Sequence, residues 1–84
     1  MIELNQLEIS VLRAMHSRNI YGAKHIRMEK VIHSGFPSHL RGDVKKAIYS
    51  LIKKGFILYA KRSKDAIQLN LNKNEEIKNF VSQI

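Results

Sequence analysis

The stretch from Pro37 to Asn72 constrains the fold most, because its apolar pattern changes period in the middle. Apolar residues first recur every three or four positions, as on one face of a helix, and this pattern ends at Gly55. Two segments rich in strand-forming residues follow at 56–61 and 67–71, separated by a polar turn at 62–65. The stretch therefore predicts a helix over 38–54, with Ser38 as its N-cap, and then a β-hairpin. The expected helix face is Leu40, Val44, Ala47, Ile48 and Leu51, and the expected hairpin face is Ile67, Leu69 and Leu71.

Two further helices are expected before this stretch. Asn5 and Glu8 have the spacing of a capping box, and apolar residues continue at helical spacing until the chain reaches Asn19. Residues 20–22 form a connector or a brief strand, and a short helix follows over about 26–33, with Met28, Val31 and Ile32 inward. Gly35 suits a left-handed position that ends this helix, and Pro37 prevents its continuation.

A last helix is expected after the hairpin. Asn72 and Glu75 repeat the capping-box spacing. The helix carries an apolar stripe formed by Ile77, Phe80, Val81 and Ile84. This stripe covers Ile2 and Ile9 of the same chain, or it pairs with a second copy to form a homodimer.

Three helices followed by a two-stranded hairpin is the element order of a winged helix-turn-helix domain. The expected fold class is thus α+β, mainly α, with a three-helix core, a two-stranded β wing and an extra C-terminal helix. A chain of 84 residues is short enough for one domain, 1–84, with core and wing over 1–72 and the last helix over 73–84.

The positive charge is concentrated in the middle of the chain. There are 15 Lys and Arg against 7 Asp and Glu, a net charge of +8. Residues 1–8 contribute −2 and residues 65–84 contribute −1, so residues 9–64 carry +11, and eight bases fall within 41–64. A surface that only confers solubility normally mixes both signs. The distribution therefore favours an anionic partner at the third helix and the hairpin turn.

The chain resembles small archaeal winged helix-turn-helix proteins from about residue 4 to residue 77. The resemblance rests on the segments 37–47 (PSHLRGDVKKA), 51–56 (LIKKGF) and 68–72 (QLNLN). It implies double-stranded DNA as the partner, with the third helix in the major groove and the wing on the backbone or minor groove. The implied role is that of a transcription regulator or chromatin-associated factor.

The expected nucleic-acid contacts divide between the third helix and the hairpin turn. Lys46 and Lys53 suit phosphates, whereas Tyr49 either donates a hydrogen bond to a phosphate or packs within the fold. Gly42 either lets the helix approach DNA closely or simply weakens its first turn. The full set is His39, Arg41, Gly42, Lys45, Lys46, Tyr49 and Lys53 on the helix and Lys61, Arg62, Ser63 and Lys64 at the turn.

Arg41 has two interpretations of its own. Its guanidinium suits a bidentate contact with guanine. Its position borders the apolar face of the helix, so an ion pair with Asp43 or Glu29 explains it equally well.

Several classes of function are not expected. The chain has no cysteine, which excludes disulfides and thiolate zinc sites. His16, His25, His33 and His39 are spaced by nine, eight and six residues, without the i, i+4 pair of a helical metal site. With no nucleophile motif and no glycine-rich phosphate loop, neither an enzyme nor a bound cofactor is expected.

The expected location is cytoplasmic and associated with the nucleoid. The longest apolar run, 56–60, is far shorter than the roughly 20 residues of a membrane span. The N-terminal residues lack the pattern of a signal peptide. Besides DNA binding, a protein–protein interaction module and an RNA-binding module stay open as alternatives.

Overall fold

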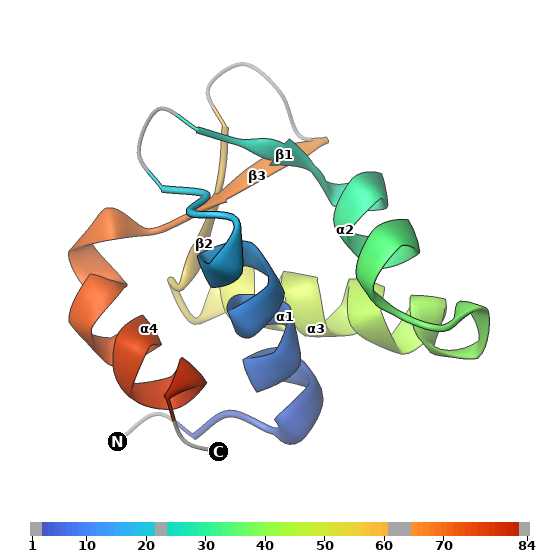
Figure 1. The fold of residues 1–84 in the computed structure, drawn as a ribbon, viewed down its shortest axis with the longest axis horizontal. Coiled ribbons are helices and arrows are strands. Elements are labelled where there is room, and N and C mark those ends of the chain that lie inside the picture. The colour runs from blue at the N-terminus through green and yellow to red at the C-terminus, as the bar shows by residue number, and fades with distance from the viewer. Residues whose placement is uncertain (1–2, 22–23, 61–64, 83–84) are drawn as a thin grey trace.

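The computed structural model describes residues 3–21, 24–60 and 65–82, and this part of the chain has a mainly helical α+β fold (Figure 1). None of its helices combines the length and the apolar character that a membrane span requires. In chain order the elements are α1 (Gln6–Ser17), β1 (Ile26–Arg27), α2 (Met28–Gly35), the 3₁₀ helix η1 (Ser38–Leu40), α3 (Arg41–Lys53), β2 (Ile57–Tyr59), β3 (Ala66–Leu69), the 3₁₀ helix η2 (Leu71–Lys73) and α4 (Asn74–Val81).

Helix α1 begins with the capping box that the sequence predicts. The Asn5 side chain accepts the backbone N–H of Glu8 at 2.8 Å, and the Asn5 backbone N–H donates to Glu8 Oε1 at 3.0 Å. The helix ends where expected, with Asn19 in a left-handed conformation at φ 55°. Asparagine tolerates this region better than most residues.

The two strands of the predicted hairpin are confirmed, and β2 pairs antiparallel with β3. The register places Ile57 opposite Leu69 and Tyr59 opposite Ile67. Ile67 and Leu69 are fully buried, as predicted, but Leu71 is 60% exposed, so its expected core position is wrong. The strand alternation ends at Asn70, because the chain there turns into η2 and Leu71 leaves the plane of the sheet.

A third strand, β1, joins the other side of β3 and gives the order β1–β3–β2. Ile26 and Arg27 fall within the second helix that the sequence predicts. They pair instead with Ile67 and Ala66, and the helix starts at Met28, whose backbone N–H donates to the carbonyl of Asp65 at 2.7 Å. Two residues are too few to show a strand period. The expected two-stranded wing is thus part of a three-stranded antiparallel sheet.

The connection between α2 and α3 also departs from expectation. Ser38 makes no N-cap hydrogen bond to the helix. The Leu40 N–H donates instead to the carbonyl of Pro37 at 3.0 Å, so the chain first makes a tight 3₁₀ turn, and α3 begins only at Arg41. Gly35 is the last residue of α2 and does not have the expected left-handed conformation.

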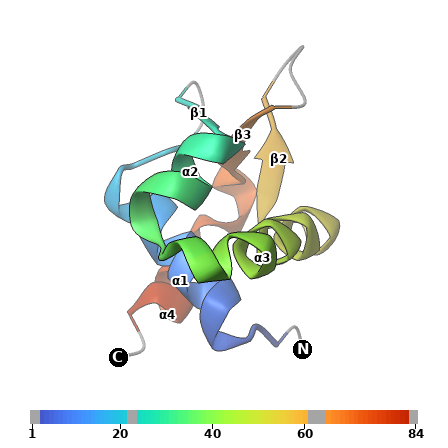
Figure 2. The same ribbon diagram turned by 90° about the vertical axis from the view of Figure 1, so that its right-hand side faces the viewer.

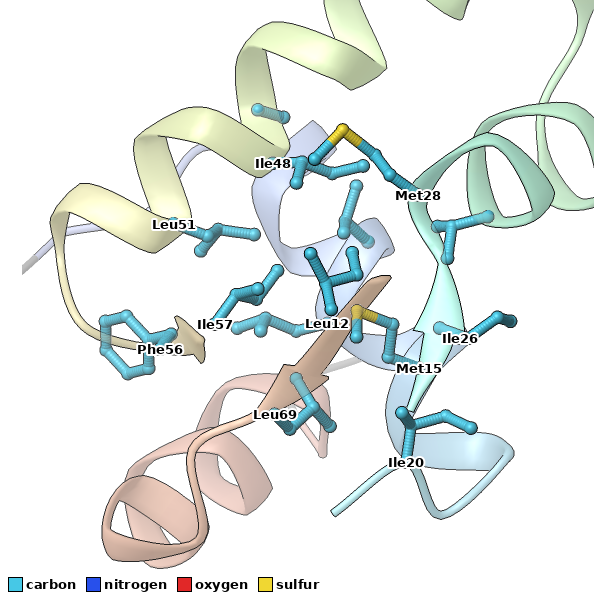
Figure 3. Close-up of a cluster of buried hydrophobic side chains, with 14 of the residues drawn as sticks. Leu12, Met15, Ile20, Ile26, Met28, Ile48, Leu51, Phe56, Ile57 and Leu69 are labelled. Atoms are coloured by element: carbon cyan, nitrogen blue, oxygen red, sulfur yellow. The ribbon is translucent and has the colours of Figure 1, made fainter. Parts of the chain in front are cut away.

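The hydrophobic core lies between α1, α3 and the sheet (Figure 3). Gly55 ends α3 in the left-handed conformation at φ 87°, as the sequence predicts, and directs the chain into β2. Phe56 and Ile57 are thereby placed under the end of α3, both fully buried. The fully buried side chains of the core are Val11, Leu12, Val44, Ile48, Leu51, Phe56, Ile57, Ile67, Leu69 and Ile77, with Met15 at 1% exposure.

Helix α4 packs beside α1 in the same chain (Figure 1). Ile77 is fully buried, and Phe80 packs edge-to-face on Phe56 with ring centroids 5.9 Å apart. Val81 also contacts the core, and Ile9 is buried. Ile2 and Ile84 lie outside the described residues. The described part of the apolar stripe thus contacts the core of its own chain, and the homodimer stays an untested alternative.

The expected cap of the last helix is wrong. Asn72 does not cap α4, which has no side-chain cap at its first turn. Asn70 takes a capping role one element earlier: its side chain accepts the N–H of Asn72 at 3.0 Å and donates to the carbonyl of Gly55 at 2.8 Å. The short η2 turn before α4 moves the helix start from residue 73 to Asn74, so the cap position falls on Lys73 instead of Asn72.

Candidate nucleic-acid interface

The polar side of α3 is exposed over its whole length, as the sequence predicts. The apolar side consists of Val44, Ala47, Ile48 and Leu51, all buried against the core. The opposite side carries four Lys or Arg residues, and Tyr49 is 46% exposed between them. The exposed predicted contacts of α3 and η1 are His39, Arg41, Gly42, Lys45, Lys46, Tyr49 and Lys53.

One group of these residues lines a hollow of about 440 Å³ between α2 and α3. In Figure 2, α2 and the sheet lie on the same side of α3. Helix α3 contributes Arg41, Gly42, Lys45 and Tyr49 to the lining. The opposite wall and the floor come from Arg27, Met28, Glu29, Ile32, His33 and Asp65.

The arginine at the start of α3 is not used in an ion pair. Arg41 forms no salt bridge with Asp43 or Glu29, although all three residues are described. Arg27 and Lys45 likewise have no ion pair with another described residue. The structural alternative for Arg41 therefore does not apply, and its charge is exposed at the rim of the hollow.

Lys46 belongs to a different surface. It lines a second hollow, of about 370 Å³, on the other side of α3, together with Asn5, Glu8, Asp43 and Ser50. The side chains of Lys45 and Lys46 therefore diverge, and the predicted contacts do not form one group. Lys46 lies beside carboxylates, whereas Arg41 and Lys45 border the more cationic hollow.

Lys54 forms a structural ion pair that the charge pattern did not reveal. Its Nζ lies 2.9 Å from Glu8 Oε2 and 3.1 Å from the carbonyl of Glu3. Ser50 Oγ donates to the same carboxylate at 2.8 Å. One of the eight bases within 41–64 thus ties the end of α3 to the start of α1. No local sequence pattern indicates this ion pair, because its two residues are 46 positions apart.

Glu8 is the buried centre of this network, with 3% of its surface exposed. Burial alone would raise the pKa of its carboxyl group. Hydrogen bonds from the Asn5 backbone, Lys54 and Ser50, together with the charge of Lys54, outweigh this effect and hold the pKa of Glu8 below its ordinary value of 4.5. Glu8 is therefore ionised in the folded protein at neutral pH.

The hairpin turn falls outside the described residues. Lys61, Arg62, Ser63 and Lys64 lie there, so their predicted contacts stay predictions. The strand before the turn is described, and it exposes two large side chains, Leu58 at 39% and Tyr59 at 41%. The sequence pattern does not single out Tyr59 or Arg27 as contact residues, because Tyr59 lies in a predicted strand and Arg27 in a predicted helix.

The four histidines do not form a cluster. His16 Nδ1 lies 3.0 Å from the hydroxyl of Tyr21, and burial raises the pKa of that tyrosine. His25 and His39 are exposed, while His33 lines the hollow between α2 and α3. Within residues 3–21, 24–60 and 65–82, no group of three or more His, Asp or Glu residues is placed to hold a metal ion.

Comparisons with protein-family models, curated proteins and solved structures find no match to this chain. The features of the molecule that bear on function are therefore the surface of α3 and the hollow beside it.

Proposed function

We propose that this chain is a winged-helix protein that binds double-stranded DNA through α3. The observation that carries the proposal is the exposed side of α3, where Arg41, Lys45 and Lys53 have no ion pair with any described residue. Unpaired cations along an exposed helix suit the phosphates of DNA, whose neutralisation releases counterions.

The order of the elements supports the proposed fold type. Three helices precede the β2–β3 hairpin, and α2 and α3 are joined by a short connection. In helix-turn-helix proteins the second helix of such a pair lies in the major groove. Lys61, Arg62 and Lys64 follow β2 in sequence, and we assign them to the backbone or minor groove beside α3.

A salt titration tests the proposal. With about five phosphates neutralised, the logarithm of the affinity for a DNA duplex falls against the logarithm of salt concentration with a slope of about −4 to −5. Fluorescence anisotropy of a labelled duplex measures this slope. A slope near zero, or no binding at low salt, contradicts DNA binding.

A charge-matched pair of variants locates the surface. Lys45→Ala with Lys53→Ala removes two charges from α3, whereas Arg13→Ala with Lys78→Ala removes two exposed charges from α1 and α4. We expect the first variant to reduce the salt slope by about 2 and to weaken binding to all duplexes alike. Equal losses in the two variants would show that net charge, and not α3, governs binding. Competition with double-stranded RNA at fixed salt tests the RNA alternative.

A further inference from the structure

The hollow between α2 and α3 combines two kinds of surface that a phosphate contact alone does not need. Its rim carries the cations Arg27, Arg41 and Lys45. Its floor includes Met28 and Ile32, which are each 7% exposed. The ring of Tyr49, nearly half exposed, lines the same space.

The size of the hollow fits a small ligand. Its volume of about 440 Å³ falls within the range of about 300–1,000 Å³ that is typical of small-molecule sites. Such sites are usually mostly apolar, whereas this hollow exposes somewhat more polar than apolar surface, which suits a ligand that carries charged as well as apolar groups. An apolar floor, one tyrosine ring and a cationic rim match a ligand that is flat and apolar at one end and anionic at the other.

The hollow also contains a carboxylate group that can accept hydrogen bonds from a ligand. Glu29 lines the hollow and has no ion pair with a described residue. Carboxylates accept hydrogen bonds from the exocyclic amino groups of nucleobases, as in their contacts with cytosine. Bases also stack on aromatic side chains in a way that depends little on their identity.

From this combination we infer that the hollow between α2 and α3 binds one nucleotide unit. The base lies over Met28 and Ile32 against Tyr49, its amino group faces Glu29, and its phosphate contacts Arg41 and Lys45. Two sources supply the same chemistry: a free nucleoside monophosphate, or an unpaired nucleotide within DNA. The free form does not require the proposed DNA binding, whereas the unpaired nucleotide rests on it.

Gly42 allows the hollow to be filled without disturbing the fold. A Cβ added at Gly42 meets no heavy atom within 4 Å, and the residue lines the hollow. Gly42→Leu therefore places a side chain in or over the site and also improves the helix propensity of α3. The matched control is Gly35→Leu, since Gly35 also has open space around it but does not line this hollow.

The first arm titrates the full-length chain with deoxycytidine 5′-monophosphate and with 2-deoxyribose 5-phosphate, followed by amide shifts in NMR spectra. We expect shifts at Gly42, Lys45 and Ile32 and a dissociation constant below about 1 mM for the nucleotide. The sugar phosphate binds at least about fivefold more weakly, because it has no base to stack. Gly42→Leu abolishes the shifts and Gly35→Leu retains them.

The second arm compares a duplex that carries one unpaired cytidine with the same duplex fully paired. If the site takes its nucleotide from DNA, the unpaired cytidine raises the affinity at least about fivefold, and Gly42→Leu, but not Gly35→Leu, removes this ratio. Either arm alone supports the inference.

The inference is overturned if the nucleotide and the sugar phosphate bind equally or not at all and the two duplexes bind with equal affinity. The affinity of the unmodified protein for the paired duplex separates this result from failure of the proposed function. Normal binding of that duplex with no preference in either arm rejects the nucleotide site and leaves DNA binding intact.

Discussion

Among single residues, Glu8 has the most consequential environment in the described structure. It is a buried carboxylate that accepts hydrogen bonds from the Asn5 backbone, Ser50 and Lys54. A buried charge is costly unless it is paired and fully hydrogen-bonded, and here it is both. The same side chain closes the capping box of α1, so one residue links a local helix signal to the packing of α1 on α3.

The lowered pKa of Glu8 predicts acid sensitivity. Because its pKa in the folded state lies below the unfolded value, its ionised form stabilises the fold at pH values above about 4.5. This stability is lost as the pH falls through the folded pKa. Glu8→Gln, which cannot form the ion pair, is expected to be about 1–3 kcal/mol less stable at pH 6. The difference should shrink as the pH approaches 3, as measured by urea unfolding.

Glu75→Gln is the control for this experiment, since Glu75 is exposed and makes no ion pair with a described residue. Its stability should follow that of the unmodified chain across the whole pH range. A constant gap between Glu8→Gln and the unmodified chain from pH 6 to pH 3 would show that the carboxylate charge contributes nothing.

Gly42 lies within α3 and Gly55 lies at its end, and replacing them with alanine is expected to change the stability of the fold in opposite directions. Gly55 has a φ of 87°, and an added Cβ would meet only Lys73 Cε at 3.9 Å, so the cost arises from the backbone. Gly55→Ala should therefore lower the free energy of unfolding by about 1 kcal/mol or more. Gly42→Ala should raise it by up to about 1 kcal/mol, because Gly42 is helical and unobstructed. Urea unfolding of both variants checks the signs, and a stabilising Gly55→Ala would contradict the argument.

These residues also show how far a sequence alone determines local structure. Gly55 and the Asn5–Glu8 capping box were predicted correctly, because each depends only on neighbours within a few positions. Ser38 was predicted wrongly, because the tight turn from Pro37 to Leu40 replaced the helix start that serine favours. Gly35 was predicted wrongly, because α2 ends by passing into extended backbone at Phe36 and not through a left-handed residue. The Glu8–Lys54 pair, 46 residues apart, leaves no local signal.

At the scale of elements, the four α-helices and the two hairpin strands of the described structure were predicted, whereas β1 and the two 3₁₀ helices were not. α1, α3 and the β2–β3 hairpin have enough residues to display a period. β1 has only two residues, and it forms by pairing antiparallel with the edge of β3 that β2 does not occupy. The division of the α3 surface into two hollows was equally hidden, since it depends on where α1 and α2 pack and not on α3 itself.

Helix α4 is expected to contribute to the stability of the whole fold. Its eight residues are too few for a stable isolated helix, so it must be held by packing. Ile77 is fully buried, and Ile77→Ala should cost about 2–5 kcal/mol in urea unfolding. Lys78→Ala, one position along and exposed, should change stability by less than about 0.5 kcal/mol. Equal small effects would mean that α4 does not pack as described.

At the scale of the whole molecule, the net charge of +8 does not act as one uniform field. Lys54 forms an ion pair with Glu8, and Lys73 forms one with Glu76. The charges of these two lysines are therefore already paired within the chain. Of the unpaired cations of α3, Arg41 and Lys45 border the hollow beside α2, whereas Lys46 lines the hollow on the other side of the helix. The proposed partner and the inferred nucleotide site therefore share one side of the molecule, while α4 lies against α1 (Figure 1).

The packing of α4 leads to a prediction about assembly. Because Ile77, Phe80 and Val81 already contact the core of their own chain, a second copy has little apolar surface to cover there. We expect sedimentation equilibrium to give a monomer of 9.7 kDa at micromolar concentrations. Under the proposed DNA-binding function, a monomer with one α3 contacts a single half-site, whereas a two-fold symmetric dimer selects paired half-sites about 34–36 Å apart. In vitro selection of DNA should accordingly enrich sites without a palindrome. A dimeric mass together with palindromic sites would instead assign the exposed edges of Phe80 and Val81 to an interface between two copies.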